Sequence, residues 1–179
     1  CAVLAKILAE KSGFRCTADA FTSAMFHDLG RTLTIHYFAD EYAAILEFAT
    51  EREIDELTAS REILGLAYFQ LGADVARDWK FPDSIIQAML PLPRGEISPT
   101  TTDEKFVSFI APFANSLCNA ALDSELNLAD EQLRSLLERS APVRSADHQD
   151  LDMAFDDANQ PTTNYAKLLK IAPDTQPSL

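Results

Sequence analysis

The amino-acid sequence predicts an all-α domain, and three observations lead to this fold class. Apolar residues recur three and four positions apart in one segment after another, the spacing that places side chains on one face of a helix. Stretches with Gly, Pro, Ser or Asp separate these segments, as expected at helix ends. No stretch has convincing strand alternation, and we find no internal repeat and no Gly-rich phosphate loop. At 179 residues the chain is long enough for a substantial core.

The predicted helical segments share an amphipathic pattern or an apolar stripe of helical period. In order they are Ala2–Lys11, Phe21–Arg31, Thr32–Ala39, Asp40–Glu51, Ile54–Leu64, Gly65–Trp79, a helix that begins near Pro82 and ends before Pro91, Asp103–Leu122, Ala129–Arg139 and Asn164–Ile171.

Four residues in these segments carry specific expectations. Gly72 in mid-helix costs about 1 kcal/mol relative to Ala, which indicates the close approach of another backbone. Pro112 is expected to kink or split its helix. Tyr68 and Trp79 lie on one apolar stripe and are predicted to be core residues. Replacement of a core Trp79 by Ala would cost about 3–5 kcal/mol.

Composition and charge exclude several classes of function. Hydrophobic residues make up 47% of the chain and charged residues 24%, which is ordinary for a soluble globular protein. A net charge of −13 without any basic cluster weighs against nucleic-acid binding, which needs a Lys/Arg surface. No apolar run is long enough to span a membrane. Cys1, Cys16 and Cys118 lack metal-type spacing and suit a reducing cytoplasm.

The segment Phe21–Arg31, read as FTSAMFHDLGR, is predicted to be the central helix, with Gly30 as its stop. Asp28 falls seven residues after Phe21, on the same apolar face, with His27 beside it. A carboxylate placed there must be paired, bonded to backbone donors or bound to a metal ion. His27 and Asp28 could offer a nitrogen and an oxygen to one divalent ion. For an isolated pair, hydrogen bonds to neighbouring helices are the preferred interpretation.

Several blocks together resemble the HDOD domain, a bacterial relative of the HD-superfamily metal phosphohydrolases. The blocks are FHDLGR, Glu62–Gly65 (EILG), Leu71–Ala73 (LGA) and Trp79–Pro82 (WKFP) before a helix. The resemblance implies an HD-domain-like helical bundle, with a helical core over residues 1–122 and a C-terminal helical extension with an acidic segment and frayed tail over residues 123–179. The family usually carries a helical subdomain upstream of the His-Asp pair. We therefore expect the chain to be the later part of a larger HDOD protein.

The resemblance also implies a metal site, which this sequence largely lacks. HD phosphohydrolases hold metal ions through a His, the His-Asp pair and a later Asp. Here the pair remains as His27 and Asp28, and Asn115 stands in place of the late Asp. Tyr68 and Gln70 stand where relatives often have His and Glu, and Pro91-Leu92 where two histidines are frequent.

A tight divalent site needs several anionic or imidazole ligands in a fixed geometry. We therefore expect no metal, no other cofactor and no phosphohydrolase activity, with His27, Asp28, Asn115 and Tyr68 as vestigial positions.

The resemblance implies a non-catalytic signalling or regulatory output module of a bacterial cytoplasm. Such a module would act through contacts with a protein partner or an adjoining signalling domain, not with nucleic acid or a membrane; the sequence does not fix its oligomeric state. The alternative is a residual HD-type phosphohydrolase acting on a nucleotide or cyclic dinucleotide. It would recruit Glu62, which is otherwise expected to cap or pair at its helix junction. A further alternative is a pocket, lined by Trp79 and Tyr68, that binds a small molecule without turnover.

Overall fold

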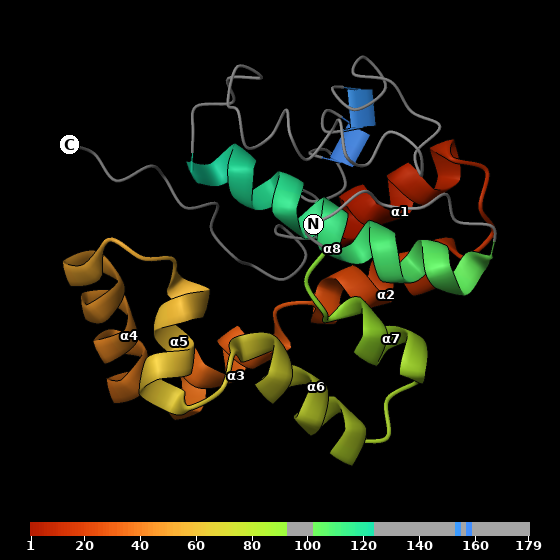
Figure 1. The fold of residues 1–179 in the computed structure, drawn as a ribbon. Coiled ribbons are helices and arrows are strands. Elements are labelled where there is room, and N and C mark those ends of the chain that lie inside the picture. Colours follow the sequence, from red (N-terminus) through yellow and green to blue (C-terminus); the bar gives the residue numbers. More distant parts are fainter. Residues whose placement is uncertain (93–101, 124–152, 155–156, 159–179) are drawn as a thin grey trace, which may run out of the picture.

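The computed structural model of the chain describes residues 1–92, 102–123, 153–154 and 157–158 (Figure 1). Within these ranges the fold is all-α, as predicted, with no strand. The elements are α1 (Ala2–Lys11), α2 (Thr17–Phe26), α3 (Leu29–Tyr37), α4 (Ala39–Arg52), α5 (Glu56–Leu64), α6 (Tyr68–Asp78), α7 (Asp83–Ala88) and α8 (Asp103–Asp123). The helices predicted at Ala129–Arg139 and Asn164–Ile171 lie outside the described residues.

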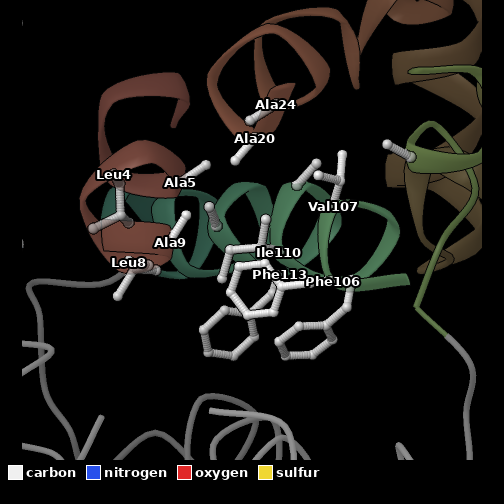
Figure 2. Close-up of a cluster of buried hydrophobic side chains, with 14 of the residues drawn as sticks. Leu4, Ala5, Leu8, Ala9, Ala20, Ala24, Phe106, Val107, Ile110 and Phe113 are labelled. Carbon is white, nitrogen blue, oxygen red and sulfur yellow. The ribbon is translucent and has the colours of Figure 1, made fainter. Parts of the chain in front are cut away.

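The main core lies where α1 and α2 pack against α8 (Figure 2). The whole apolar stripe of α8 faces the core. All five of its large residues are buried: Phe106, Phe109, Ile110, Phe113 and Leu117. The facing sides of α1 and α2 supply mainly small residues, which let the helix backbones approach α8 closely. The members of this set are Ala5, Ala9, Ala20 and Ala24. α8 is continuous through Pro112, so of the two predicted outcomes, a kink or a split, the split does not occur.

Two smaller clusters extend the fold away from this core. α6 and α7 share one around Ala76, Ile86 and Met89. α4 and α5 form a hairpin around Ile45 and Ala59, and Tyr68 of α6 completes that cluster. In Figure 1 this hairpin lies at one side of the molecule, with α3 and α6 between it and the main core.

The crossing of α3 and α6 depends on two glycines. A Cβ atom added to Gly30 would lie 1.8 Å from the backbone oxygen of Tyr68, and one added to Gly72 would lie 2.8 Å from the backbone nitrogen of Gly30. The predicted close approach at Gly72 is therefore confirmed. The predicted role of Gly30 is wrong: it lies inside α3, in contact with α6, and does not end a helix.

Trp79 is the main correction to the predicted core. Its side chain is 54% exposed, because α6 ends at Asp78 and Trp79 lies just beyond the helix. Tyr68, at the other end of α6, is buried as predicted. No helix in the described ranges combines the length and the hydropathy needed to cross a bilayer. Cys1, Cys16 and Cys118 are free thiols, and burial raises the pKa of Cys16.

Candidate functional site

The His-Asp pair lies in the turn between two helices and not within one. α2 ends at Phe26 and α3 begins at Leu29, so the predicted single helix over Phe21–Arg31 is interrupted at His27 and Asp28. The break changes the direction of the chain. The seven-residue spacing from Phe21 therefore no longer places Asp28 on the buried face.

His27 makes the structural hydrogen bond that the sequence analysis preferred. Its Nδ1 lies 2.6 Å from the backbone oxygen of Ala88, the last residue of α7. A carbonyl oxygen can only accept, so Nδ1 carries the proton and donates it. In neutral His27, Nε2 then keeps a lone pair that can accept a hydrogen bond.

Asp28 differs from the expectation. Its side chain is exposed, and it has no hydrogen bond or ion pair with any residue that the structure describes. It precedes the first residue of α3 without capping that helix through its side chain. The prediction that Asp28 is a buried carboxylate with a bonding partner is therefore wrong. Asp28 instead has an exposed carboxyl group that no described residue engages.

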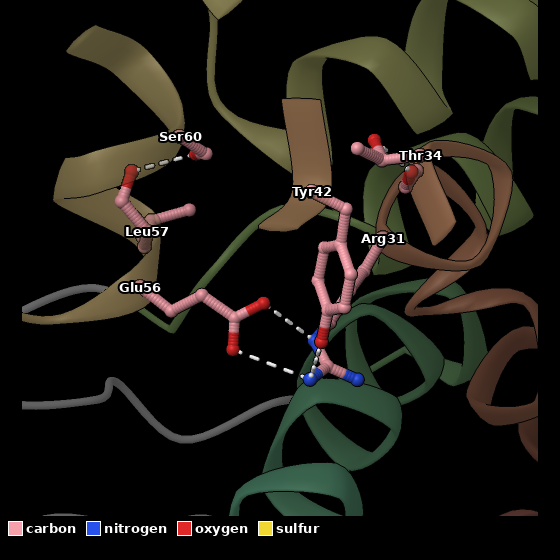
Figure 3. A network of polar contacts seen from close by, with 7 residues as sticks. Arg31, Thr34, Tyr42, Glu56, Leu57 and Ser60 are labelled. Carbon is pink, nitrogen blue, oxygen red and sulfur yellow. Dashed lines mark hydrogen bonds and ion pairs between the residues drawn. The ribbon is translucent and has the colours of Figure 1, made fainter. Parts of the chain in front are cut away.

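Arg31, one turn further along α3, is the centre of a polar cluster that the sequence analysis missed (Figure 3). Its Nε lies 2.8 Å from Oε1 of Glu56, and its Nη2 lies 3.2 Å from Oε2. Nη2 also donates to the hydroxyl of Tyr42 at 2.6 Å. Such a two-pronged guanidinium–carboxylate pair fixes geometry as well as charge. It ties α3 to both helices of the α4–α5 hairpin.

Tyr68 lies next to this cluster with its side chain only 7% exposed. Its hydroxyl meets no hydrogen-bond partner among the described residues. Burial, and next the nearby carboxylate of Glu56, raise the pKa of Tyr68 well above its ordinary value of 10. Tyr68 therefore stays protonated at neutral pH and is a poor metal ligand.

Asn115 does not join the other predicted site residues. It is buried in α8, and its Nδ2 donates to the backbone oxygens of Ala24 at 3.1 Å and Ala111 at 2.9 Å. The amide therefore links α8 to α2 as part of the helix packing. Asn119, one turn later on α8, lines the same cavity as His27 and Asp28.

One cavity of about 510 Å³ brings the relevant side chains together. Its polar lining comes from the α2–α3 turn, α3, α5, α6 and α8, and consists of His27, Asp28, Arg31, Glu56, Tyr68 and Asn119. Of the predicted vestigial positions, three line this cavity and Asn115 does not.

Three other residues that the sequence suggested for the site, Glu62, Gln70 and Trp79, do not line the cavity. Glu62 is exposed on α5, does not line the cavity, and neither caps nor pairs with a described residue. Trp79 does not line the cavity. Oε1 of Gln70 accepts a hydrogen bond from the backbone nitrogen of Ala67 at 2.9 Å, which occupies it at the start of α6.

The donor set does not fit the metal site of the HD phosphohydrolases. Within the described residues, no three His, Cys, Asp or Glu side chains are placed to hold one ion. Glu56 is held by Arg31, Tyr68 is protonated, and Asn115 lies in the packing of α8 on α2 and does not line the cavity. Among the described His, Cys, Asp and Glu side chains of the cavity, only His27 and Asp28 keep unengaged donor atoms, and a tight divalent site needs more such ligands.

Comparisons with known proteins identify the family. A family model of the HDOD domain matches residues 1–91, which is half of the chain. The chain therefore belongs to the HDOD family, as the sequence motifs indicated. No curated protein gives a significant match.

A crystal structure of an HDOD domain protein of unknown function from Geobacter sulfurreducens has a similar fold. Its TM-score is 0.62 at 18% sequence identity, over 91% of this chain. This chain spans 56% of the length of that protein.

Proposed function

We propose that this HDOD domain is a non-catalytic regulatory module that acts through contacts with a protein partner or an adjoining signalling domain. The proposal is carried by one observation: the polar side chains at the site bond to neighbouring helices. Asn115 links α8 to α2, and His27 is bonded to α7. Arg31 forms an ion pair with Glu56, which joins α3 to α5. These side chains hold helices together, and they leave too few free ligands for a catalytic metal.

Exposed aromatic surface supports a role in protein contact. Trp79 is half exposed, and its ring centroid lies 6.0 Å from that of Phe81. Phe81 in turn makes an edge-to-face contact with Phe26, so one side of the Trp79 ring packs on aromatic side chains of the protein. Tryptophan is enriched among the residues that dominate binding energy at protein interfaces. Trp79 is also the single tryptophan of the chain, so its fluorescence reports on any partner that covers it.

The proposal is tested on the purified full-length protein by metal analysis and a phosphodiesterase assay. With Mn²⁺ added, we expect substoichiometric metal and no turnover of bis(p-nitrophenyl) phosphate above the buffer rate. His27→Ala should leave that baseline unchanged. Tightly held stoichiometric metal, with turnover that His27→Ala abolishes, would contradict the proposal and favour the residual phosphohydrolase.

The contact surface is tested separately with candidate partners, including domains encoded in the same protein. We expect a blue shift of the Trp79 emission on binding, because a partner would remove the ring from water. Trp79→Ala should weaken that binding at least tenfold, as expected for an interface anchor. Ile35→Ala removes another exposed apolar residue, on α3, and provides the matched control. Equal loss of binding in both variants would show that Trp79 is not the anchor.

A further inference from the structure

Among the described residues, the lining of the cavity beside the His-Asp pair has one carboxylate more than it has cationic side chains. Its lining contains two carboxylates, Asp28 and Glu56, and one guanidinium, Arg31. Glu56 and Arg31 neutralise each other through their two-pronged pair. Asp28 has no partner among the described residues, so the cavity carries a net charge of about −1 when His27 is neutral.

The free acceptors with the strongest pull on a cation belong to Asp28 and His27. Asp28 offers two carboxylate oxygens, and neutral His27 offers Nε2 because its Nδ1 already donates to Ala88. The guanidinium of Arg31 has its charge paired with Glu56 and its Nη2 also bonded to Tyr42, while its Nη1 has no partner among the described residues. A phosphate group would therefore meet a free carboxylate and only a neutralised cation. A ligand with positive charge and N–H donors would find matching groups.

The cavity has further properties of a binding site. Its volume of about 510 Å³ lies within the usual range for small-molecule pockets, roughly 300–1,000 Å³. Leu57, Phe69 and Met89 give it an apolar wall. The hydroxyl of Tyr68 is buried in the lining next to the carboxylate of Glu56, without a hydrogen-bond partner of good geometry among the described residues.

We propose that this cavity binds a small organic cation, an amine or amidine attached to a compact apolar body. The cationic N–H groups would face Asp28 and Nε2 of His27, and the apolar body would lie against Phe69 and Met89. This inference goes beyond the proposed contact function and does not depend on it.

The test uses two probes of equal shape and opposite charge, benzamidine and benzoate, in isothermal titration calorimetry with the full-length protein. Salt at about 0.15 M screens attraction to the acidic surface, since the Debye length there is about 8 Å. We expect benzamidine to bind with one-to-one stoichiometry and benzoate and inorganic phosphate not to bind. Asp28→Asn should weaken benzamidine at least about tenfold, because a charged hydrogen bond is lost.

Asp40→Asn is the matched control, since Asp40 is an exposed carboxylate on α4 that does not line the cavity. It should change the affinity less than twofold. Circular dichroism melting checks that both variants are folded. Equal weakening by both substitutions, or none by Asp28→Asn, would show that benzamidine binds the acidic surface. Absence of benzamidine binding at about 10 mM ligand, or tighter binding of phosphate, would also overturn the proposal.

Discussion

The α3–α6 crossing allows a quantitative prediction for Gly30→Ala. The added Cβ would lie 1.8 Å from the Tyr68 backbone oxygen, whereas Cβ contacts below about 3.0 Å essentially do not occur. α3 and α6 must therefore separate by about 1.2 Å. The contact is with backbone, so no side-chain rotation can relieve it. The separation also loosens packing around Gly72, whose own Cβ position is blocked by Gly30.

Two opposing effects determine how much Gly30→Ala changes the free energy of unfolding. Overpacking costs typically about 1–3 kcal/mol, and a backbone clash belongs at the upper end. Replacing Gly by Ala within a helix returns about 1 kcal/mol of helix propensity. We therefore expect Gly30→Ala to lower the free energy of unfolding by about 2 kcal/mol. For a chain of this size that corresponds to a Tm lower by about 4–8 °C.

The assay is urea denaturation followed by circular dichroism at 222 nm. Thr32→Ala, at an exposed position of the same helix, is the control and should be neutral or slightly stabilising. A Gly30→Ala variant as stable as the wild type, or more stable, would mean that helix propensity dominates. The close crossing of α3 and α6 would then be incorrect.

Three further predictions concern stability. Trp79→Ala should cost about 1 kcal/mol, against about 3–5 kcal/mol for the fully buried Phe106→Ala, when both are measured by urea denaturation. Asn115→Asp should destabilise more than Asn115→Ala in the same assay at pH 7, since it aims a buried anion at two backbone oxygens. Asp55 accepts hydrogen bonds from the backbone nitrogen and hydroxyl of Thr58, and the hydroxyl bond is the main reason that its pKa is lowered from 3.8. Asp55→Ala should therefore cost about 1 kcal/mol at pH 7. Because the folded-state pKa is depressed, this difference from the wild type should persist down to about pH 4 and disappear as the pH falls through the lowered pKa in an acid denaturation series.

Helical periodicity predicted the fold well wherever a helix is long and regular. The stripe of α8 is the clearest example, since Phe106 through Leu117 are buried at the expected spacing. The same rule failed where a helix ended sooner than the pattern. Trp79 lies one residue past α6, and Asp28 lies in the turn after α2, so neither keeps the phase of its helix.

Glycine positions show why some contacts could be predicted and others could not. Gly72 lies in the middle of a strong helical pattern, where a close backbone contact is the natural explanation. Gly30 follows a pattern that also suits a helix end, and local sequence cannot separate the two roles. The pair formed by Arg31 and Glu56 joins residues 25 positions apart on different helices. Neither residue has a local signal for it, because the pairing depends on how α3 and α5 pack.

The location of the cavity connects the two proposals physically. The α4–α5 hairpin has its own small core and packs mainly on α3 and α6, through Tyr68 and the Arg31–Glu56 pair. The cavity is lined by Glu56 from that hairpin and by Asn119 from α8. A ligand held there would therefore touch both the hairpin and the main core, and its binding energy would oppose their separation. Such a ligand can change the stability of the hairpin without any chemical step, which is what a regulatory module requires.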